Sequence, residues 1–315
     1  MWCRIWLRMS RTRYRDGHLF IMPITVLSKV SETRMHLSAR RRAQPRNVVL
    51  VPTMGALHEG HAQLIRQARE LAGDEGTVVV SIFVNPTQFG PNEDLDRYPR
   101  SLDRDSEVCQ DCGADLIFAP GSADMYAPDH SFDVRETGLS MGLCGASRSG
   151  HFPGVCLVVL KLFNIVHPTH AVFGKKDYQQ LAVIRRLVRD LNVPVEIVGG
   201  ETVREEDGLA MSSRNANLTD AERRDAPGIQ EALQAGRARW EKLPDIAPGL
   251  LIRLVRSRLE QISSGQIDYL ELVDGETLHS VQGVIEKPVV MATAMFFSKA
   301  RLIDNIEFGP KAQTG

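Results

Sequence analysis

The sequence lacks several features that would assign it to a class of protein. No apolar run reaches the roughly 18–20 residues of a membrane span. The nearest candidate, "GVCLVVLKLFNIV", contains Lys161 and indicates a buried helix instead. The net charge of −1 argues against a nucleic acid or a membrane surface as the main partner. What remains is a chain of 315 residues, 43% hydrophobic and without repeats, which can bury a core and form two domains.

Cysteine is also scarce. The five cysteines are an odd number, in a chain too long to need disulfides for stability. This favours reduced thiols and a cytoplasmic setting. Cys109 and Cys112 have CxxC spacing, but no second pair follows that would complete a zinc site. Together with Leu102 they fall at helical spacing, so we interpret them as the core face of a helix.

The first 21 residues differ from the rest of the chain. "MWCRIWLRMSRTRYRDGHLFI" contains five arginines and one aspartate, and it lacks the apolar centre and cleavage site of a signal peptide. An arginine-rich, acid-poor start leaves organelle targeting open as an alternative. We interpret residues 1–21 as a non-native or disordered extension and expect the fold to begin at Met22.

From Met22 onward, strand and helix patterns alternate. Strands that are apolar throughout and alternate with helices predict a parallel sheet covered on both faces. We therefore expect an α/β, Rossmann-like, doubly wound domain over residues 22–202. The predicted strands are 24–27, 47–51, 77–84, 115–119, 170–174 and 195–199, and the helices are 28–42, 61–71, 101–112, 154–166 and 178–191.

Composition changes after about residue 202. Two helical stretches, 219–239 and 248–262, precede the strand-like runs "IDYLELVD", "PVVMATAMFF" and "RLIDNIEF". We expect residues 203–315 to form a smaller α+β domain that acts as a lid over the active site.

The segment "PTMGALHEGH", residues 52–61, lies where the first core strand gives way to a helix. In an open parallel sheet, ligands bind at the carboxyl ends of the strands. Gly55 and Gly60 allow the backbone to approach a phosphate closely, and the amide groups at the helix start favour an anion. We expect the imidazoles of His58 and His61 to donate to the same phosphate.

Other interpretations of this segment are weaker. Neither the dinucleotide motif GxGxxG nor the P-loop motif GxxxxGK[ST] occurs in the sequence. A metal site would need more than two histidines three residues apart, and no third ligand is evident.

Three later segments also place polar side chains where a ligand would bind. Two of them follow predicted strands, and the third is the long polar loop "REEDGLAMSSRNANLT". That loop equally fits an interdomain connection that caps the helix beginning at Asp220. Taken together, the three segments favour a site for phosphate and neutral polar groups. The side chains concerned are Asn85, Gln88, Lys176, Asp177, Gln180, Ser212, Ser213 and Arg214.

Four segments carry a resemblance to a known family. "PTMGALHEGH", "SIFVNPTQFG", "GKKDYQQL" and "DGLAMSSRN" match, in order and spacing, the signature segments of the pantothenate synthetase (pantoate–β-alanine ligase) family. The chain resembles that family over roughly residues 22–312. The family belongs to the HIGH-type nucleotidyltransferases, so the resemblance implies a Rossmann-like fold and a homodimer.

The resemblance implies a two-step ligation with ATP, pantoate and β-alanine as substrates. The carboxylate of pantoate attacks the α-phosphate of ATP, which gives pantoyl adenylate and pyrophosphate. The amine of β-alanine then attacks the acyl carbonyl, and pantothenate and AMP are released.

The resemblance also implies roles for individual residues. His61 is the family's proton donor, and we expect His58, Lys176 and Arg214 to act with it on the phosphates. Gln88 contacts pantoate and β-alanine, and Gln180 contacts pantoate. The segment Met211–Arg214 corresponds to the mobile KMSKS loop. The implied ATP-binding residues are Met54, Gly55, Ala56, Leu57, His58, Glu59, Gly60, His61, Gly174, Lys175, Lys176, Asp177, Val203, Met211, Ser212, Ser213 and Arg214.

Three positions depart from the family pattern. Ser149 stands where "RPGHF" often has its proline, and Lys175 stands where "GEKD" has glutamate. Near "YPR", the positions sometimes credited with magnesium read Asp103-Arg104-Asp105, so one carboxylate is missing. The protein ligands of Mg²⁺ therefore stay open, and we expect the ion to be held mostly by the triphosphate of ATP.

Two alternative functions remain open. The first is another HIGH-type enzyme, such as a cytidylyltransferase, although the glutamines of "NPTQFG" and "DYQQL" argue against it. The second is a non-catalytic nucleotide-binding protein, against which the cluster of histidines, lysine and arginine argues.

Overall fold

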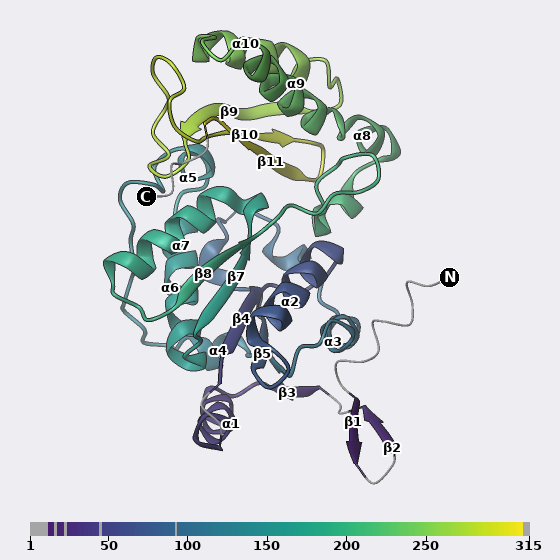
Figure 1. Cartoon of the computed structure of the whole chain (residues 1–315), viewed down its shortest axis with the longest axis vertical. Helices are drawn as coiled ribbons and strands as arrows, with labels where there is room; N and C mark the ends of the chain where they lie inside the picture. The colour runs from purple at the N-terminus through teal and green to yellow at the C-terminus, as the bar shows by residue number, and fades with distance from the viewer. Residues whose placement is uncertain (1–11, 16–17, 22–23, 44–45, 92, 311–315) are drawn as a thin grey trace. The chain divides into compact units, whose positions relative to one another are not determined.

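The computed structural model describes residues 12–15, 18–21, 24–43, 46–91 and 93–310 (Figure 1). The chain divides into two compact units rather than at a single cut near residue 202. The larger unit comprises residues 1–135, 150–174 and 184–200, and the smaller unit comprises residues 136–149, 175–183 and 201–315.

The larger unit is built on a six-stranded sheet in which all neighbouring strands are parallel. The strand order is β3-β6-β5-β4-β7-β8, so the order reverses at β4. Such a reversal is the switch point at which open α/β sheets bind ligands. The predicted Rossmann-like sheet is confirmed, with strands β3 (Thr25–Leu27), β4 (Val48–Thr53), β5 (Thr77–Ile82), β6 (Leu116–Phe118), β7 (His170–Gly174) and β8 (Glu196–Gly200).

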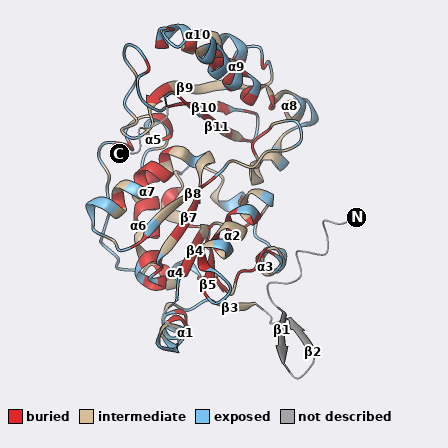
Figure 2. Ribbon diagram, viewed as in Figure 1, coloured by how far each residue is buried: buried red, intermediate tan, exposed pale blue. Residues whose placement is uncertain are grey.

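Helices cover both faces of this sheet because its central strands are apolar on both sides. Val49 and Val51 of β4 pack with Ile65 of α2, while the alternate residue Leu50 is also fully buried. Figure 2 shows the central strands almost wholly buried. The helical segments are α1 (Val30–Ala43), α2 (Glu59–Ala72), η2 (Pro86–Gln88), η3 (Leu95–Arg97), α3 (Leu102–Asp111), α4 (Ser122–Met125), α6 (His151–Val166) and α7 (Tyr178–Asp190), whose first turns group with the smaller unit.

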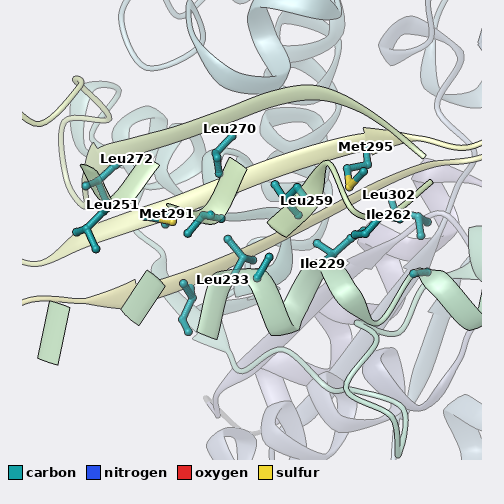
Figure 3. Packing of buried hydrophobic residues seen from close by; sticks show 14 of the residues in the cluster. Ile229, Leu233, Leu251, Leu259, Ile262, Leu270, Leu272, Met291, Met295 and Leu302 are labelled. Atoms are coloured by element: carbon teal, nitrogen blue, oxygen red, sulfur yellow. The ribbon is translucent and has the colours of Figure 1, made fainter. Parts of the chain in front are cut away.

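The smaller unit contains an antiparallel three-stranded sheet in the order β11-β10-β9. Leu233 of α9, Leu251 of α10 and Met291 of β10 belong to the cluster that joins the sheet to its helices (Figure 3). The predicted α+β character is therefore confirmed. The elements are α5 (Leu143–Ser147), η4 (Lys175–Asp177), η5 (Ser213–Asn217), α8 (Asp220–Asp225), α9 (Gly228–Lys242), α10 (Pro248–Leu259), β9 (Gln266–Asp274), β10 (Val289–Phe296) and β11 (Arg301–Phe308).

One predicted helix is two helices. The stretch 219–239 is divided between α8 and α9, with Pro227 between them. Proline has no backbone N–H to donate, so a helix tends to end or restart there.

The CxxC pair packs in the core, as the helical spacing predicted. Cys109 lies on α3, Cys112 caps its carboxyl end, and both belong to the cluster between α2, α3 and the sheet. Leu102 was expected on the same face, but it is the first residue of α3 and is 41% exposed. All four cysteines in the described ranges are buried, and none of them is joined in a disulfide.

Part of the predicted N-terminal extension has regular backbone structure. The strands β1 (Thr12–Arg15) and β2 (His18–Ile21) pair antiparallel and form a sheet of their own. The interpretation of residues 1–21 as a non-native or disordered extension stays a prediction. The predicted start at Met22 lies outside the described residues. Within the ranges that are described, no helix has the length and apolar character needed to cross a membrane.

Candidate active site

The sequence-predicted site residues fall into two groups, one in each unit. The larger unit carries Met54–His61, Gln88 and Gly174, and the smaller unit carries Lys175–Asp177, Gln180, Val203 and Met211–Arg214.

The loop between β4 and α2 is held by a carboxylate from α3. Gly55 and Ala56 have φ values of 87° and 52°, in the left-handed region. The buried Asp105 accepts the backbone N–H of Ala56 at 3.0 Å and that of Leu57 at 2.8 Å. One side chain from α3 therefore fixes the backbone of the turn that leads from β4 into α2.

Asp105 also explains the glycine at position 55. A Cβ atom there would lie 2.9 Å from the Oδ2 of Asp105 and 3.1 Å from the side chain of Ile82. Glycine at position 55 therefore makes room for this carboxylate, and its role in letting a phosphate approach stays a prediction. Because both oxygens of Asp105 accept loop amides, this side chain holds the loop in place.

The two histidines of the motif cap the start of α2. The Nδ1 of His58 accepts the N–H of Gly60 at 3.1 Å, and the Nδ1 of His61 accepts the N–H of His58 at 3.4 Å. Their ring centroids are 4.1 Å apart. An atom that accepts from a backbone N–H carries no proton, so hydrogen bonding assigns both rings the tautomer with hydrogen on Nε2. Each imidazole is thereby prepared as an Nε2–H donor.

Glu59 is the acidic residue within this motif. Its carboxylate is bonded twice to the guanidinium of Arg66, at 2.5 and 3.3 Å. The pairing offsets a negative charge that would otherwise oppose an anion at the start of the helix.

Gln88 lies buried at the end of η2, after β5. Its Nε2 donates to the sulfur of Met54 at 3.3 Å, and its Oε1 accepts from the Nδ2 of Asn85 at 3.0 Å. An amide has two hydrogens and two oxygen lone pairs, and these two bonds use one of each. The side chain is thus oriented, and these two bonds use half of its hydrogen-bonding capacity.

Asn85 organises the surroundings of Gln88. Its Oδ1 accepts from the hydroxyl of Tyr126 at 2.7 Å, and its Nδ2 also donates to the carbonyl of Gly154 at 3.2 Å. A Cβ on Gly154 would lie 2.2 Å from the carbonyl oxygen of Thr87, so only glycine lets α6 approach η2 this closely. The sequence offered Asn85 as a candidate ligand contact, and the structure gives it a scaffolding role.

His151, at the start of α6, was not foreseen as part of this arrangement. Its Nδ1 lies 2.9 Å from the carbonyl oxygen of Gln88, and it is buried. A carbonyl oxygen can only accept, so the ring nitrogen carries the proton. The segment "RSGHF" therefore supports Gln88 through its histidine, while its departing residue, Ser149, is exposed.

In the smaller unit, the structure joins two predicted ATP-binding positions. The N–H of Met211 donates to the carbonyl of Val203 at 3.0 Å, and an isolated bridge pairs Arg204 with Ala210. Residues 203–211 thus form a hairpin. Ser212 then caps the start of η5, and its hydroxyl accepts the N–H of Arg214 at 3.2 Å.

The lysines of "GKKD" have different surroundings. The Nζ of Lys175 lies 2.6 Å from a carboxylate oxygen of Glu201 and 3.1 Å from one of Glu307. Burial lowers the pKa of Lys175, but these two carboxylates outweigh it and raise the pKa above its ordinary value. The positive charge added by Lys175 is therefore paired with the carboxylates of Glu201 and Glu307.

Lys176 has the opposite shift. Burial lowers its pKa below the ordinary value of a lysine. The carboxylates of Asp177 and Asp304 oppose this shift, while the guanidinium groups of Arg214 and Arg204 reinforce it. A partly buried ammonium among other cations gains from the arrival of an anion.

The two adjacent glutamines of "DYQQL" also differ in their burial and hydrogen bonds. Gln179 is buried and donates to the carbonyls of Leu139 at 2.9 Å and Gly142 at 2.7 Å. Gln180 is only partly buried. Gln179 therefore serves the fold, which leaves Gln180 as the member of the pair suited to a ligand.

No group of three or more histidine, cysteine or acidic side chains suited to a metal ion occurs among the described residues. The donors of both units are imidazole, ammonium, guanidinium and amide groups, which match phosphates and carboxylates better than they match a cation.

Comparison with known proteins places this arrangement in context. A sequence model of the family "Pantoate-beta-alanine ligase" matches residues 25–307. "Pantothenate synthetase" of Akkermansia muciniphila is 52% identical over 261 residues, covering 83% of this chain and 92% of the relative. "Pantothenate synthetase" of Thermotoga neapolitana is 48% identical, covering 88% of this chain and 98% of the relative.

Solved structures agree with these relatives. The crystal structure of pantothenate synthetase from Thermus thermophilus has a TM-score of 0.84 and 44% identity, and covers 91% of this chain and 100% of its own. Pantoate-beta-alanine ligase from Francisella tularensis, crystallised with "Beta-gamma ATP" and β-alanine, has a TM-score of 0.71 and 31% identity, covering 90% of this chain and 97% of its own.

Proposed function

Because the chain belongs to the pantoate–β-alanine ligase family, we propose that the two groups of residues divide the work of its ATP-dependent condensation of pantoate with β-alanine. The first half of the reaction forms pantoyl adenylate and pyrophosphate. The second half transfers the pantoyl group to the amine of β-alanine and releases AMP.

The first half needs positive or donating groups around the phosphates. Negative charge builds on the α-phosphate as the carboxylate attacks and on the departing pyrophosphate. Preorganised donors stabilise such charge strongly in a site with little water. We assign this task to His58 and His61 in one unit and to Lys176 and Arg214 in the other.

One observation carries this assignment. Both motif histidines accept backbone amides through Nδ1, at 3.1 and 3.4 Å, so the proton of each neutral ring lies on Nε2. They lie after β4, the strand at which the sheet order reverses. Two imidazoles that share one tautomer at the start of a helix support binding of an oxyanion.

The acyl substrate needs a different environment. A carboxylate nucleophile loses basicity when it is tightly paired with a cation. The neutral amides of Gln88 and Gln180 orient the hydroxyls and carboxylate of pantoate without neutralising the attacking group. The fixed side chain of Gln88, held by Met54 and Asn85, supports this role, and we assign β-alanine to Gln88 as well.

The metal enters with the nucleotide. The described residues offer no cluster of three or more histidine, cysteine or acidic side chains suited to a metal ion. We therefore propose that Mg²⁺ arrives as part of the ATP substrate, held by phosphate oxygens and water. We further propose that the protein is cytoplasmic, as its cysteines suggest, and that it forms a homodimer, as the resemblance implies. Light scattering of the purified protein tests the dimer.

Two assays test the function. Pantoate alone is expected to promote exchange of labelled pyrophosphate into ATP, and net conversion of ATP to AMP is expected only when β-alanine is added. A cytidylyltransferase would prefer CTP and a phosphorylated substrate, and a non-catalytic protein would bind ATP without either reaction. Absence of pantoate-dependent exchange would overturn the proposal.

A further inference from the structure

Strand β11 contacts the "GKKD" turn through the side chain of Asn305. The Nδ2 of Asn305 donates to the carbonyl of Lys175 at 3.0 Å and to the carbonyl of Lys176 at 2.9 Å. Asn305 is 8% exposed. One amide nitrogen has two hydrogens, so it satisfies both carbonyls of the turn and fixes the backbone from which Lys176 projects.

The preceding residue holds the second segment. Asp304 binds the guanidinium of Arg204 with both oxygens, at 2.7 and 3.0 Å, and is 4% exposed. Arg204 also donates to the carbonyl of Gly208 at 3.1 Å, across the turn of the 203–211 hairpin. A bidentate pair between arginine and a carboxylate fixes orientation as well as distance. Asp304 therefore sets where this hairpin, with Val203 and Met211 in it, lies on the strand.

The two contacts leave the strand in opposite directions. Consecutive residues of a β-strand point to opposite faces, so Asp304 and Asn305 reach different segments from one short stretch. Leu302 and Ile306 of the same strand lie in the hydrophobic cluster of the smaller unit. The stretch is thus anchored in a core, which gives both contacts a rigid base.

We propose that Asp304 and Asn305 are positioning residues for the nucleotide, which together hold the Lys175–Asp177 turn and the 203–214 loop in the arrangement that adenylation requires. The inference rests on the proposed function, since it assigns these residues to the same reaction. Neither residue needs to touch ATP. They act through Lys176 on one side and through the hairpin on the other.

The charges around Lys176 provide a readout specific to this role. Asp177 and Asp304 raise the pKa of Lys176, while Arg214 and Arg204 lower it, against a background in which burial lowers it most. Removing the charge of Asp304 leaves the guanidinium of Arg204 unpaired and takes away a carboxylate that favours the ammonium. The pKa of Lys176 is then expected to fall further.

The experiment uses the full chain with Asn305→Asp, Asn305→Ser and Asp304→Asn. Asn305→Asp keeps the shape of the side chain but turns an oxygen toward two carbonyls, and Asn305→Ser removes the amide with less repulsion. We expect pantoate-dependent pyrophosphate exchange to fall about 10- to 100-fold with a higher KM for ATP, as small displacements of reacting groups typically cost. The KM for β-alanine is expected to stay unchanged. Asp304→Asn is also expected to move the alkaline limb of kcat/KM for ATP to lower pH.

Asp268→Asn is the matched control. Asp268 pairs with Arg301 at 2.6 Å in the same unit, so its loss removes a largely buried ion pair without touching either nucleotide segment. We expect it to lower Tm while the KM for ATP and the pH profile stay as in the wild type. Arg204→Lys keeps the charge but loses the two-pronged contact. It is expected to raise the KM for ATP in a protein that still folds, because Arg204 is partly exposed.

The outcomes separate this inference from the proposed function. If the wild type exchanges pyrophosphate and the variants lower only Tm, as Asp268→Asn does, then Asp304 and Asn305 are merely structural and the inference is overturned. If the wild type itself shows no pantoate-dependent exchange, the proposed function fails before any variant is compared.

Discussion

The nucleotide segments of the two units are held in place by different means. The start of α2 is capped by its own histidines, through hydrogen bonds between residues two and three positions apart. The "GKKD" turn depends on Asn305, through bonds that span 129 and 130 positions, and the hairpin depends on Asp304 across 100 positions. The first arrangement is local, and the second is imposed by tertiary structure.

This difference predicts how many segments a single substitution affects. Loss of a cap made by neighbouring residues is expected to act first on the start of α2 itself, because its two hydrogen bonds lie within that segment. A change in β11 reaches two segments at once, because consecutive residues hold both. Asp105 is the exception in the larger unit, since it brings a long-range contact to the otherwise local motif.

The largest effects are expected from removing a donor in either unit. We expect His61→Ala and Lys176→Ala each to slow pantoate-dependent pyrophosphate exchange by about 10²–10³, or roughly 3–4 kcal/mol in the barrier. Equal losses would show that His61, held by local hydrogen bonds, and Lys176, held by a distant residue, stabilise the transition state to a similar extent. Circular dichroism and Tm serve as the fold control. A loss below about tenfold at either position would remove that residue from the charge-stabilising set.

A smaller effect is expected from Asp105→Asn. One oxygen still accepts the N–H of Leu57, but the new NH₂ group faces the N–H of Ala56, which loses its partner. An unsatisfied buried donor costs about 1–3 kcal/mol, so we expect a lower Tm together with a higher KM for ATP. Asp103→Asn is the matched control, because Asp103 is exposed on the same helix. An unchanged KM for ATP in Asp105→Asn would show that the loop does not depend on this clamp.

The lowered pKa of Lys176 predicts a pH effect. Lysine is charged below its pKa, so the ammonium is lost as pH rises through a value lower than the ordinary 10.5. Since kcat/KM for ATP reports groups of the free enzyme, it is expected to decline on the alkaline side earlier than an ordinary lysine would allow. The Lys176→Arg variant is expected to react more slowly than the wild type. Because arginine stays charged, its kcat/KM is also expected not to show this early alkaline decline. An unchanged alkaline limb in Lys176→Arg would assign the titration to another group.

The neighbouring glutamines of α7 give the smallest predicted kinetic effect and the sharpest internal comparison. Gln180→Ala is expected to raise the KM for pantoate while Tm and ATP affinity measured without pantoate stay unchanged. Gln179→Ala removes two bonds to buried carbonyls and is expected to lower stability by about 1–3 kcal/mol. If instead Gln179→Ala raised the KM for pantoate and Gln180→Ala lowered stability, Gln179 would be the ligand contact and Gln180 the structural residue.

The features that sequence could reveal are the local and periodic ones. The apolar strands predicted the parallel sheet, and the apolar spacing of "HAQLIRQAREL" predicted the helix that the structure begins at Glu59. Asp105 was hidden because an aspartate on a polar helix usually faces solvent, and it had been considered only for a metal. Asn305 and Asp304 were hidden because polar residues within a strand carry no sign of the segments they meet. Long-range hydrogen bonds of this kind depend on the fold as a whole.

The most direct measurement compares the two half-reactions in His61→Ala. This imidazole is proposed to stabilise charge on the phosphates during adenylation, whereas the second step begins from an acyl group that is already activated. Supplied with preformed pantoyl adenylate and β-alanine, the variant is therefore expected to keep much of the wild-type rate of pantothenate formation, although its pyrophosphate exchange has collapsed. Equal losses in both half-reactions would mean that His61 holds the adenylate itself, which would contradict the charge-stabilising role.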